Sequence, residues 1–129
     1  MAKKRILLID DETTLTRLLA LNLQQAGDYE VRTENQGPQG LAAALAFRPH
    51  LVLLDVVMPD MGGGEVAAQI SNHPRLQDTV VVFMTAIVSK QEAEKRGGVI
   101  GGHPFIAKPV TTEELVAFIE RHLPHNAPS

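Results

Sequence analysis

The sequence predicts an α/β fold in which an open, parallel, doubly wound sheet carries helices on both faces. Short apolar runs alternate with segments of helical periodicity along the chain, and this alternation is typical of βαβ units. The 129 residues provide room for about five such units and for one domain. A closed barrel needs about eight units, so an open sheet is favoured.

Five segments have the character of strands: residues 6–9, 30–33, 51–54, 80–84 and 105–107. The first, third and fourth are continuously apolar, as expected of parallel strands that are covered on both faces. The second alternates between polar and apolar residues, which indicates an edge strand. Because right-handed crossovers leave few topologies, we expect a five-stranded sheet of the flavodoxin-like order 2-1-3-4-5.

Apolar stripes at helical spacing predict four helices, around residues 15–23, 41–46, 66–70 and 115–123. The first stripe stops at Gly27, and a proline follows each of the others. Thr111 and Glu114 have the spacing of a capping box before the last stripe. Ser89 and Glu92 have the same spacing, but almost no apolar stripe follows them, so this fourth helix in chain order is expected to be short or mobile.

Composition and charge exclude several classes of protein. The net charge of −3 supplies no strong attraction to nucleic acid, so we expect no direct DNA binding. The chain has no cysteine, which excludes disulfides and Cys-bound zinc. The basic residues 1–5 precede an apolar run that is too short for a signal peptide or a membrane span. We therefore expect a cytoplasmic protein without membrane insertion.

The length also bears on domain organisation. We expect one domain over residues 4–123, a loose tail at residues 124–129 and no output domain. The five histidines have no metal-ligand spacing, and we expect them at the surface.

Charged and hydroxyl side chains directly follow four of the expected strands. Asp10 and Asp11 follow the first, Asp55 the third, Thr85 the fourth and Lys108 the fifth. Each taken singly has an ordinary role as a helix cap, a turn residue or a loop charge. Ligands of open α/β sheets, however, bind outside the carboxyl ends of the strands, where these side chains would meet.

Three carboxylates at one sheet edge repel each other and raise one another's pKa unless a cation lies among them. The expected cluster contains oxygen donors but neither cysteine nor histidine. Oxygen donors of this kind favour Mg²⁺ over zinc. The sequence therefore predicts a magnesium site at this edge.

Four motifs carry these residues: ILLIDDE from residue 6, LVLLDVVMP from residue 51, MTA from residue 84 and FIAKP from residue 105. Together they resemble the receiver domain of two-component response regulators, over nearly the whole chain and in the family's order and spacing. The resemblance is to the stand-alone, chemotaxis-type regulators. It implies a module that accepts a phosphoryl group from a histidine kinase or phosphotransfer protein and then switches its binding to a downstream protein.

The resemblance also implies roles for the site residues. Asp55 is the implied phosphoacceptor. Asp10 and Asp11, with Asp55 and the backbone carbonyl of Val57, are the implied ligands of Mg²⁺. Lys108 is implied to contact the phosphoryl group.

Further implied roles concern switching and signal duration. Thr85 is the implied switch hydroxyl and Phe105 the switch aromatic. The peptide bond before Pro109 is expected to be cis. Side chains at Val57 and Ile87 are expected to set the lifetime of the phosphorylated state, and the fourth helix, fifth strand and fifth helix are expected to face partners.

Two other functions fit the sequence less well. An aspartate-dependent phosphohydrolase on a related sheet would need an acid two positions after the nucleophile, where this chain has Val57. An electron carrier that binds FMN would need a glycine-rich phosphate loop and ring-stacking aromatics, but aromatics are only 4% of the chain. We expect no enzyme beyond self-catalysed phosphotransfer and slow self-dephosphorylation.

Overall fold

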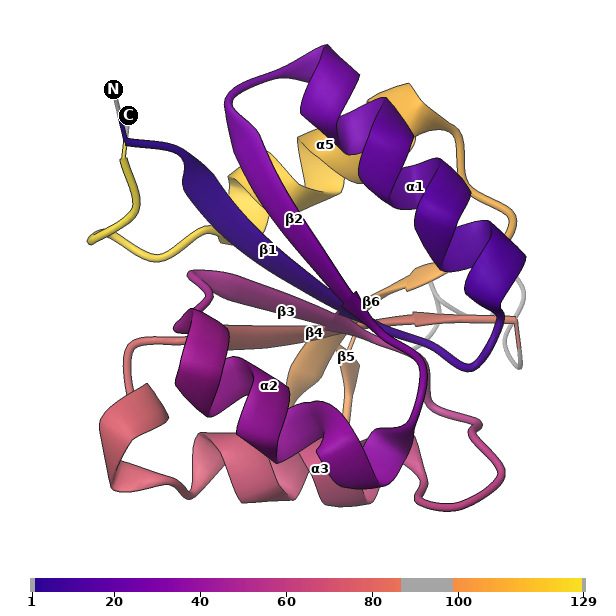
Figure 1. The fold of residues 1–129 in the computed structure, drawn as a ribbon, viewed down its shortest axis with the longest axis vertical. Helices are drawn as coiled ribbons and strands as arrows, with labels where there is room; N and C mark the ends of the chain where they lie inside the picture. The colour runs from indigo at the N-terminus through magenta and orange to yellow at the C-terminus, as the bar shows by residue number, and fades with distance from the viewer. Residues whose placement is uncertain (1, 87–98, 129) are drawn as a thin grey trace.

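Five parallel strands form the centre of the structure, a computed structural model that describes residues 2–86 and 99–128 (Figure 1). The strands are β1 (Lys4–Ile9), β2 (Tyr29–Glu34), β3 (Leu51–Leu54), β4 (Val80–Thr85) and β6 (His103–Ala107). They lie in the order β2-β1-β3-β4-β6, which confirms the expected topology. The polar, alternating β2 is the edge strand, as its sequence indicated.

The structure adds one strand to the expected sheet. A two-residue strand, β5 (Val99–Ile100), pairs antiparallel with β6 and makes the sheet six-stranded. Gly101 and Gly102 connect the two strands with φ values of 55° and 85°. Both residues thus adopt the positive φ that a two-residue hairpin of type I′ requires and that glycine adopts without strain.

Four helices within the described ranges cover the two faces of the sheet. α1 (Thr13–Ala26) and α5 (Thr112–His122) lie on one face, and α2 (Gly40–Phe47) and α3 (Gly63–Ser71) lie on the other (Figure 1). Two short 3₁₀ turns precede α2 and β4, at Gly37–Gln39 and Pro74–Leu76. None of the helices that the structure describes is long and apolar enough to span a membrane.

The start of α5 is fixed by the capping box that the sequence predicts. The Thr111 hydroxyl accepts a hydrogen bond of 3.1 Å from the Glu114 amide, and the Glu114 carboxylate accepts one of 2.9 Å from the Thr111 amide. These bonds satisfy two amide groups at the helix end. The helix expected after Ser89 lies outside the described residues.

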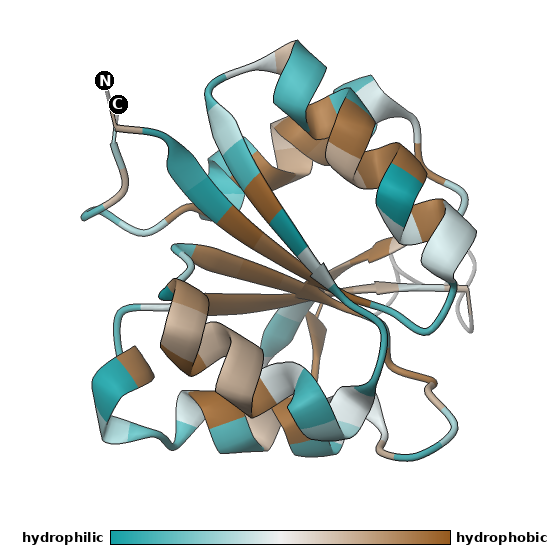
Figure 2. Cartoon of the chain, in the orientation of Figure 1, coloured by the Kyte–Doolittle hydropathy of each residue, from teal (hydrophilic) through white to brown (hydrophobic). Residues whose placement is uncertain are grey.

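The hydrophobic core is divided into two layers, one on each face of the sheet. Successive strand residues point to opposite faces, so Leu53 belongs to the layer under α1 and α5, and Leu54 belongs to the layer under α2 and α3. Figure 2 shows the central strands as hydrophobic over most of their length. Burial on both faces explains why these strands read as continuous apolar runs.

Candidate functional site

The site residues are positioned by backbone hydrogen bonds that continue the sheet beyond its strands. The Asp10 amide donates to the Glu34 carbonyl at 3.1 Å, and the Asp55 amide donates to the Ile9 carbonyl at 2.9 Å. At the carboxyl ends of β4 and β6, the Lys108 amide donates to the Thr85 carbonyl at 2.9 Å. Side chains from β1, β3, β4 and β6 are therefore held at one sheet edge, as the sequence predicts.

Three carboxylates meet at this edge. Asp10, Asp11 and Asp55 each offer an oxygen, and these oxygens all lie within 4.8 Å of one another. Asp10 is 1% exposed and Asp55 is 6% exposed, whereas Asp11 is open to solvent. The cluster could hold a metal ion because it combines hard oxygen donors with buried negative charge.

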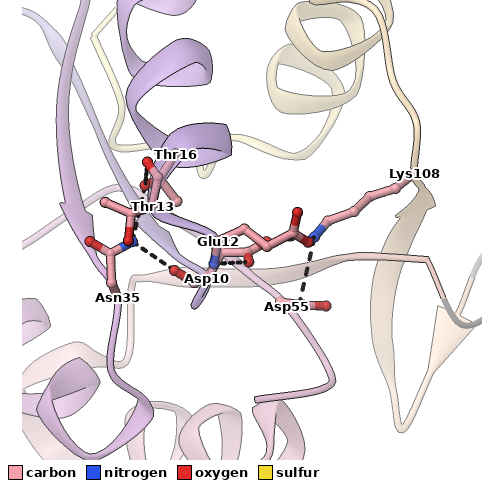
Figure 3. Close-up of polar contacts among 7 residues, drawn as sticks. All are labelled: Asp10, Glu12, Thr13, Thr16, Asn35, Asp55 and Lys108. Carbon is pink, nitrogen blue, oxygen red and sulfur yellow. Dashed lines mark hydrogen bonds and ion pairs between the residues drawn. The ribbon is translucent and has the colours of Figure 1, made fainter. Parts of the chain in front are cut away.

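Lys108 reaches into this cluster from the end of β6 (Figure 3). Its ammonium donates a hydrogen bond of 2.6 Å to Oδ2 of Asp10 and one of 3.1 Å to Oε1 of Glu12. The nearest oxygen of Asp55 lies 3.7 Å from the same nitrogen. The lysine is therefore bound to the β1 side of the cluster and also within ion-pair range of Asp55.

The electrostatic environment shifts the pKa values of two of these groups. Burial raises the pKa of the Asp55 carboxyl above its ordinary value, and the charge of Asp10 raises it further, while Lys108 opposes both effects. Burial alone would lower the pKa of the Lys108 ammonium, but its hydrogen bonds to Asp10 and Glu12 outweigh that effect and raise it. Ionised Asp55 is thus disfavoured by its surroundings, while the Lys108 charge is favoured.

Two residues that the sequence analysis gave no role support the loop after β1. Glu12 pairs with Lys108, and its amide donates a hydrogen bond of 3.0 Å to Oδ1 of Asp10. The Asn35 side-chain amide donates to the Asp10 carbonyl at 2.8 Å and to the Thr16 hydroxyl at 3.0 Å (Figure 3). Asn35 directly follows β2, so the rule that found the other site residues also points to it.

Gly63, the first residue of α3, packs against the phosphoacceptor candidate. A Cβ atom at this position would lie 2.1 Å from the Asp55 carbonyl oxygen, which no side chain could tolerate. The Gly63 amide donates a hydrogen bond of 2.8 Å to the Val56 carbonyl. The glycine therefore allows α3 to begin directly on the backbone that carries Asp55.

The remaining candidates lie in different environments. Thr85 and Phe105 are buried, at 0% and 4% exposure, in β4 and β6. Val57 is 56% exposed in the loop after β3, and its amide donates a hydrogen bond to the Asp55 carboxylate. The peptide bond before Pro109 is cis. Ile87 lies outside the described residues.

Comparison with known proteins gives relatives over most of the chain. The "DNA-binding dual master transcriptional regulator RpaA" of Synechocystis is 33% identical over 88% of this chain, but the match covers only 46% of that regulator. Protein PilG of Pseudomonas aeruginosa is 27% identical, and the match covers 96% of this chain and 90% of PilG. The chain thus spans about half the length of several curated relatives that it matches.

The fold has close counterparts among solved structures. The chemotaxis protein CheY4 of Vibrio cholerae superposes with a TM-score of 0.80 at 29% identity, covering 95% of this chain and 100% of that one. These similarities give no support to the phosphohydrolase alternative. The family model of the response regulator receiver domain matches residues 6–120. The chain therefore belongs to the response regulator receiver domain family, the phosphorylation-controlled signalling modules of two-component systems.

Proposed function

We propose that Asp55 accepts a phosphoryl group from the phosphohistidine of a histidine kinase or phosphotransfer protein. An oxygen of the Asp55 carboxylate attacks phosphorus, the phosphorus–nitrogen bond of the donor breaks, and the imidazole nitrogen retains the electron pair and takes up a proton. The observation that carries this proposal is the convergence of three carboxylates within 4.8 Å and of a lysine 3.7 Å from Asp55.

The donor set fits Mg²⁺. Asp10, Asp11 and Asp55, with the backbone carbonyl of Val57, would hold the ion, because hard oxygen ligands and clustered negative charge suit it. When bound, Mg²⁺ supplies neutralisation of charge on the phosphoryl oxygens. Buried Asp10 can act as a ligand without rearrangement of the sheet, since its backbone is held by Glu34 and Asn35.

Lys108 provides the second positive charge. Its ammonium stays protonated because hydrogen bonds to Asp10 and Glu12 outweigh the effect of burial and hold its pKa above the ordinary value. When Asp55 carries a phosphoryl group, Lys108 transfers one of its hydrogen bonds from Asp10 to a phosphoryl oxygen. Because Lys108 Nζ already lies 3.7 Å from Asp55, a small side-chain rotation achieves this change.

Thr85 and Phe105 are the proposed link from this local event to the protein surface. Thr85 is two positions beyond Phe83, and Phe83 pairs in register with Phe105. Strand alternation therefore places Thr85 and Phe105 on the same face of the sheet. Movement of the Thr85 hydroxyl toward the phosphoryl group would change the space available to Phe105 and so alter the nearby partner face, formed by β6, α5 and the expected fourth helix.

The proposed unit is residues 4–123, which acts by contact with a downstream protein rather than by turnover of a substrate. We place this exchange in the cytoplasm, where receiver domains typically act. Family membership and the match over residues 6–120 support both statements.

The test is incubation with Mg²⁺ and acetyl phosphate, followed by intact-mass measurement and peptide mapping. We expect a gain of one phosphoryl group on the peptide that contains Asp55, and no gain in Asp55→Ala or in the presence of EDTA. The matched control is Asp60→Ala, which removes an exposed carboxylate from the same loop. Full labelling of Asp55→Ala would refute the assignment.

A further inference from the structure

A polar cavity lies at the amino-terminal ends of the parallel strands, opposite the edge that carries Asp55. It has a volume of about 110 Å³ and is lined by residues from β1, the α2–β3 connection, the segment between α3 and β4, and Asn126 of the segment after α5. The lining includes three arginines, one histidine and one acid: Arg5, Arg48, Arg75, His50 and Asp78. The formal charge of the lining is therefore positive, although the whole chain carries −3.

His50 is buried in the wall of this cavity, contrary to the expectation of surface histidines. It is 8% exposed, and its Nδ1 accepts a hydrogen bond of 2.9 Å from the Arg5 amide. A neutral imidazole that accepts at Nδ1 carries its proton on Nε2. Burial and the charge of Arg5 lower the pKa of His50, which favours this neutral form at pH 7.

The Nε2–H group of His50 has no acceptor among residues 2–86 and 99–128. In the described part of the chain, every fully buried polar side-chain atom has a hydrogen-bond partner. Because Nε2 has none, it is not fully buried, and we infer that it is reached from the cavity that His50 lines. A donor that faces the cavity can therefore bind water or a ligand that enters it.

The arginines add donors that the protein itself leaves unused. Arg5 is held in place because its Nε donates a hydrogen bond of 2.9 Å to the Arg48 carbonyl, which leaves its terminal nitrogens available. The guanidinium groups of Arg48 and Arg75 make no ion pair with any carboxylate in the described ranges. Arg48 has a φ of 54°, so its backbone is fixed in the left-handed conformation that ends α2.

We propose that this cavity binds a phosphate group, either as inorganic phosphate or as the phosphate of a small phosphorylated molecule. Guanidinium forks match the oxygens of a tetrahedral dianion, and the neutral His50 donor adds a directional hydrogen bond. His50 and Asp55 flank the four residues of β3, so the cavity lies roughly 16 Å from the carboxylate cluster. The site is therefore separate from the Asp55 cluster and does not depend on the function proposed for it.

The test is a titration of the ¹⁵N-labelled protein with inorganic phosphate at constant ionic strength, followed by NMR. We expect saturable shifts of the amides of Arg5, His50 and Arg75 and of the His50 Nε2–H signal, with no comparable change at Asp10 or Asp55. A parallel titration with glycerol 3-phosphate distinguishes the two sources, because tighter binding of the ester would assign the site to a phosphorylated small molecule.

The variant Arg48→Gln/Arg75→Gln tests whether these two arginines bind the phosphate. Both side chains are exposed, so we expect the fold to tolerate their substitution. It should weaken phosphate binding by at least about tenfold. Arg17→Gln/Arg121→Gln makes the same change of net charge at exposed positions on α1 and α5 and should bind as the wild type does. Shifts that do not saturate, that chloride reproduces, or that persist unchanged in Arg48→Gln/Arg75→Gln would overturn the proposal.

Discussion

Lys108 donates a hydrogen bond of 2.6 Å to Asp10, although the strands that precede these residues, β6 and β1, are separated in the sheet by β3 and β4. The ammonium thus neutralises one of the carboxylates that we propose as metal ligands. A cation bound by Asp10 must compete with Lys108 for the same charge. We therefore expect Lys108 to lower the metal affinity of the cluster, in addition to the phosphoryl contact proposed for it.

Replacement of Lys108 by methionine should therefore strengthen Mg²⁺ binding. Removal of a positive charge beside the carboxylate cluster lowers the electrostatic cost of a divalent ion, by an amount we put at roughly 1.4 kcal/mol or tenfold in affinity. Isothermal titration calorimetry measures this change. Lys3→Met, which removes an exposed lysine before β1, should leave the affinity unaltered, and equal or weaker binding by Lys108→Met would contradict the prediction.

Asp55→Asn should stabilise the metal-free protein at neutral pH. The folded-state pKa of Asp55 is raised by burial and by Asp10, so the folded state binds more protons than the unfolded state, and ionisation of Asp55 costs stability as pH rises through that pKa. We expect the free energy of unfolding of Asp55→Asn to exceed that of the wild type by about 1 to 3 kcal/mol at pH 7.5.

That difference should shrink as pH falls to and below about 4, the ordinary pKa of an aspartate, because Asp55 is then neutral in the folded state and becomes neutral in the unfolded state as well. Urea denaturation in EDTA across this pH range measures both effects. Asp60→Asn is the control, since Asp60 is exposed in the same loop. A gain in stability that is the same at every pH would show that repulsion and desolvation of the charge are not its cause.

Alanine at two adjacent glycines should have opposite effects. Gly63→Ala places a Cβ atom 2.1 Å from the Asp55 carbonyl oxygen and should destabilise the fold by at least about 2 kcal/mol. Gly64→Ala adds a Cβ atom with nothing within 4 Å in the first turn of α3 and should stabilise by about 0.4 to 1 kcal/mol. Thermal unfolding of the two variants provides the comparison. Equal melting temperatures would show that the backbone at Gly63 shifts enough to avoid the clash with the Asp55 carbonyl.

The lifetime of the phosphorylated state should depend on Val57. The Val57 side chain is exposed beside Asp55 and can neither bind nor orient an attacking water. Asparagine at this position should speed loss of phosphate by roughly ten- to a hundredfold. Decay of phosphorylated protein in Mg²⁺ measures the rate, Val99→Asn is an exposed valine control on β5, and an unchanged rate in Val57→Asn would show that position 57 does not set the lifetime.

The parallel sheet and the edge that carries the acidic cluster could be predicted because they depend on strong local signals. Continuous apolar runs identified β1, β3 and β4, and the geometry of parallel sheets alone could place the site residues at their carboxyl ends: Asp10 and Asp55 after β1 and β3, and Thr85 as the last residue of β4. The capping box at Thr111 could be predicted for the same reason, since it depends on residues only three positions apart.

The features that could not be predicted from the sequence depend mostly on contacts between segments that are distant in the chain. Glu12 pairs with Lys108, which is distant in the chain, and spacing along the chain does not show such a contact. Asn35 could have been found because it directly follows β2, but its hydrogen bond to the Asp10 carbonyl is a contact that only the fold shows. β5 has only two residues and no periodicity to detect, although its Gly101-Gly102 turn is a recognised hairpin signal. His50 looked like a surface residue because its burial depends on how Arg5 and the α2–β3 connection pack around it.

The division of the core into two layers has a consequence for how the chain tolerates change. Leu53 and Leu54 are neighbours in β3, yet their side chains pack against different helices and meet only through the backbone of the sheet. Substitutions in separate packing environments without shared partners combine additively. Sequence variation can therefore accumulate independently on the side of the sheet that faces α1 and α5 and on the side that faces α2 and α3. Both sides contribute to the same free energy of unfolding, but a substitution on one side does not alter the side-chain packing on the other.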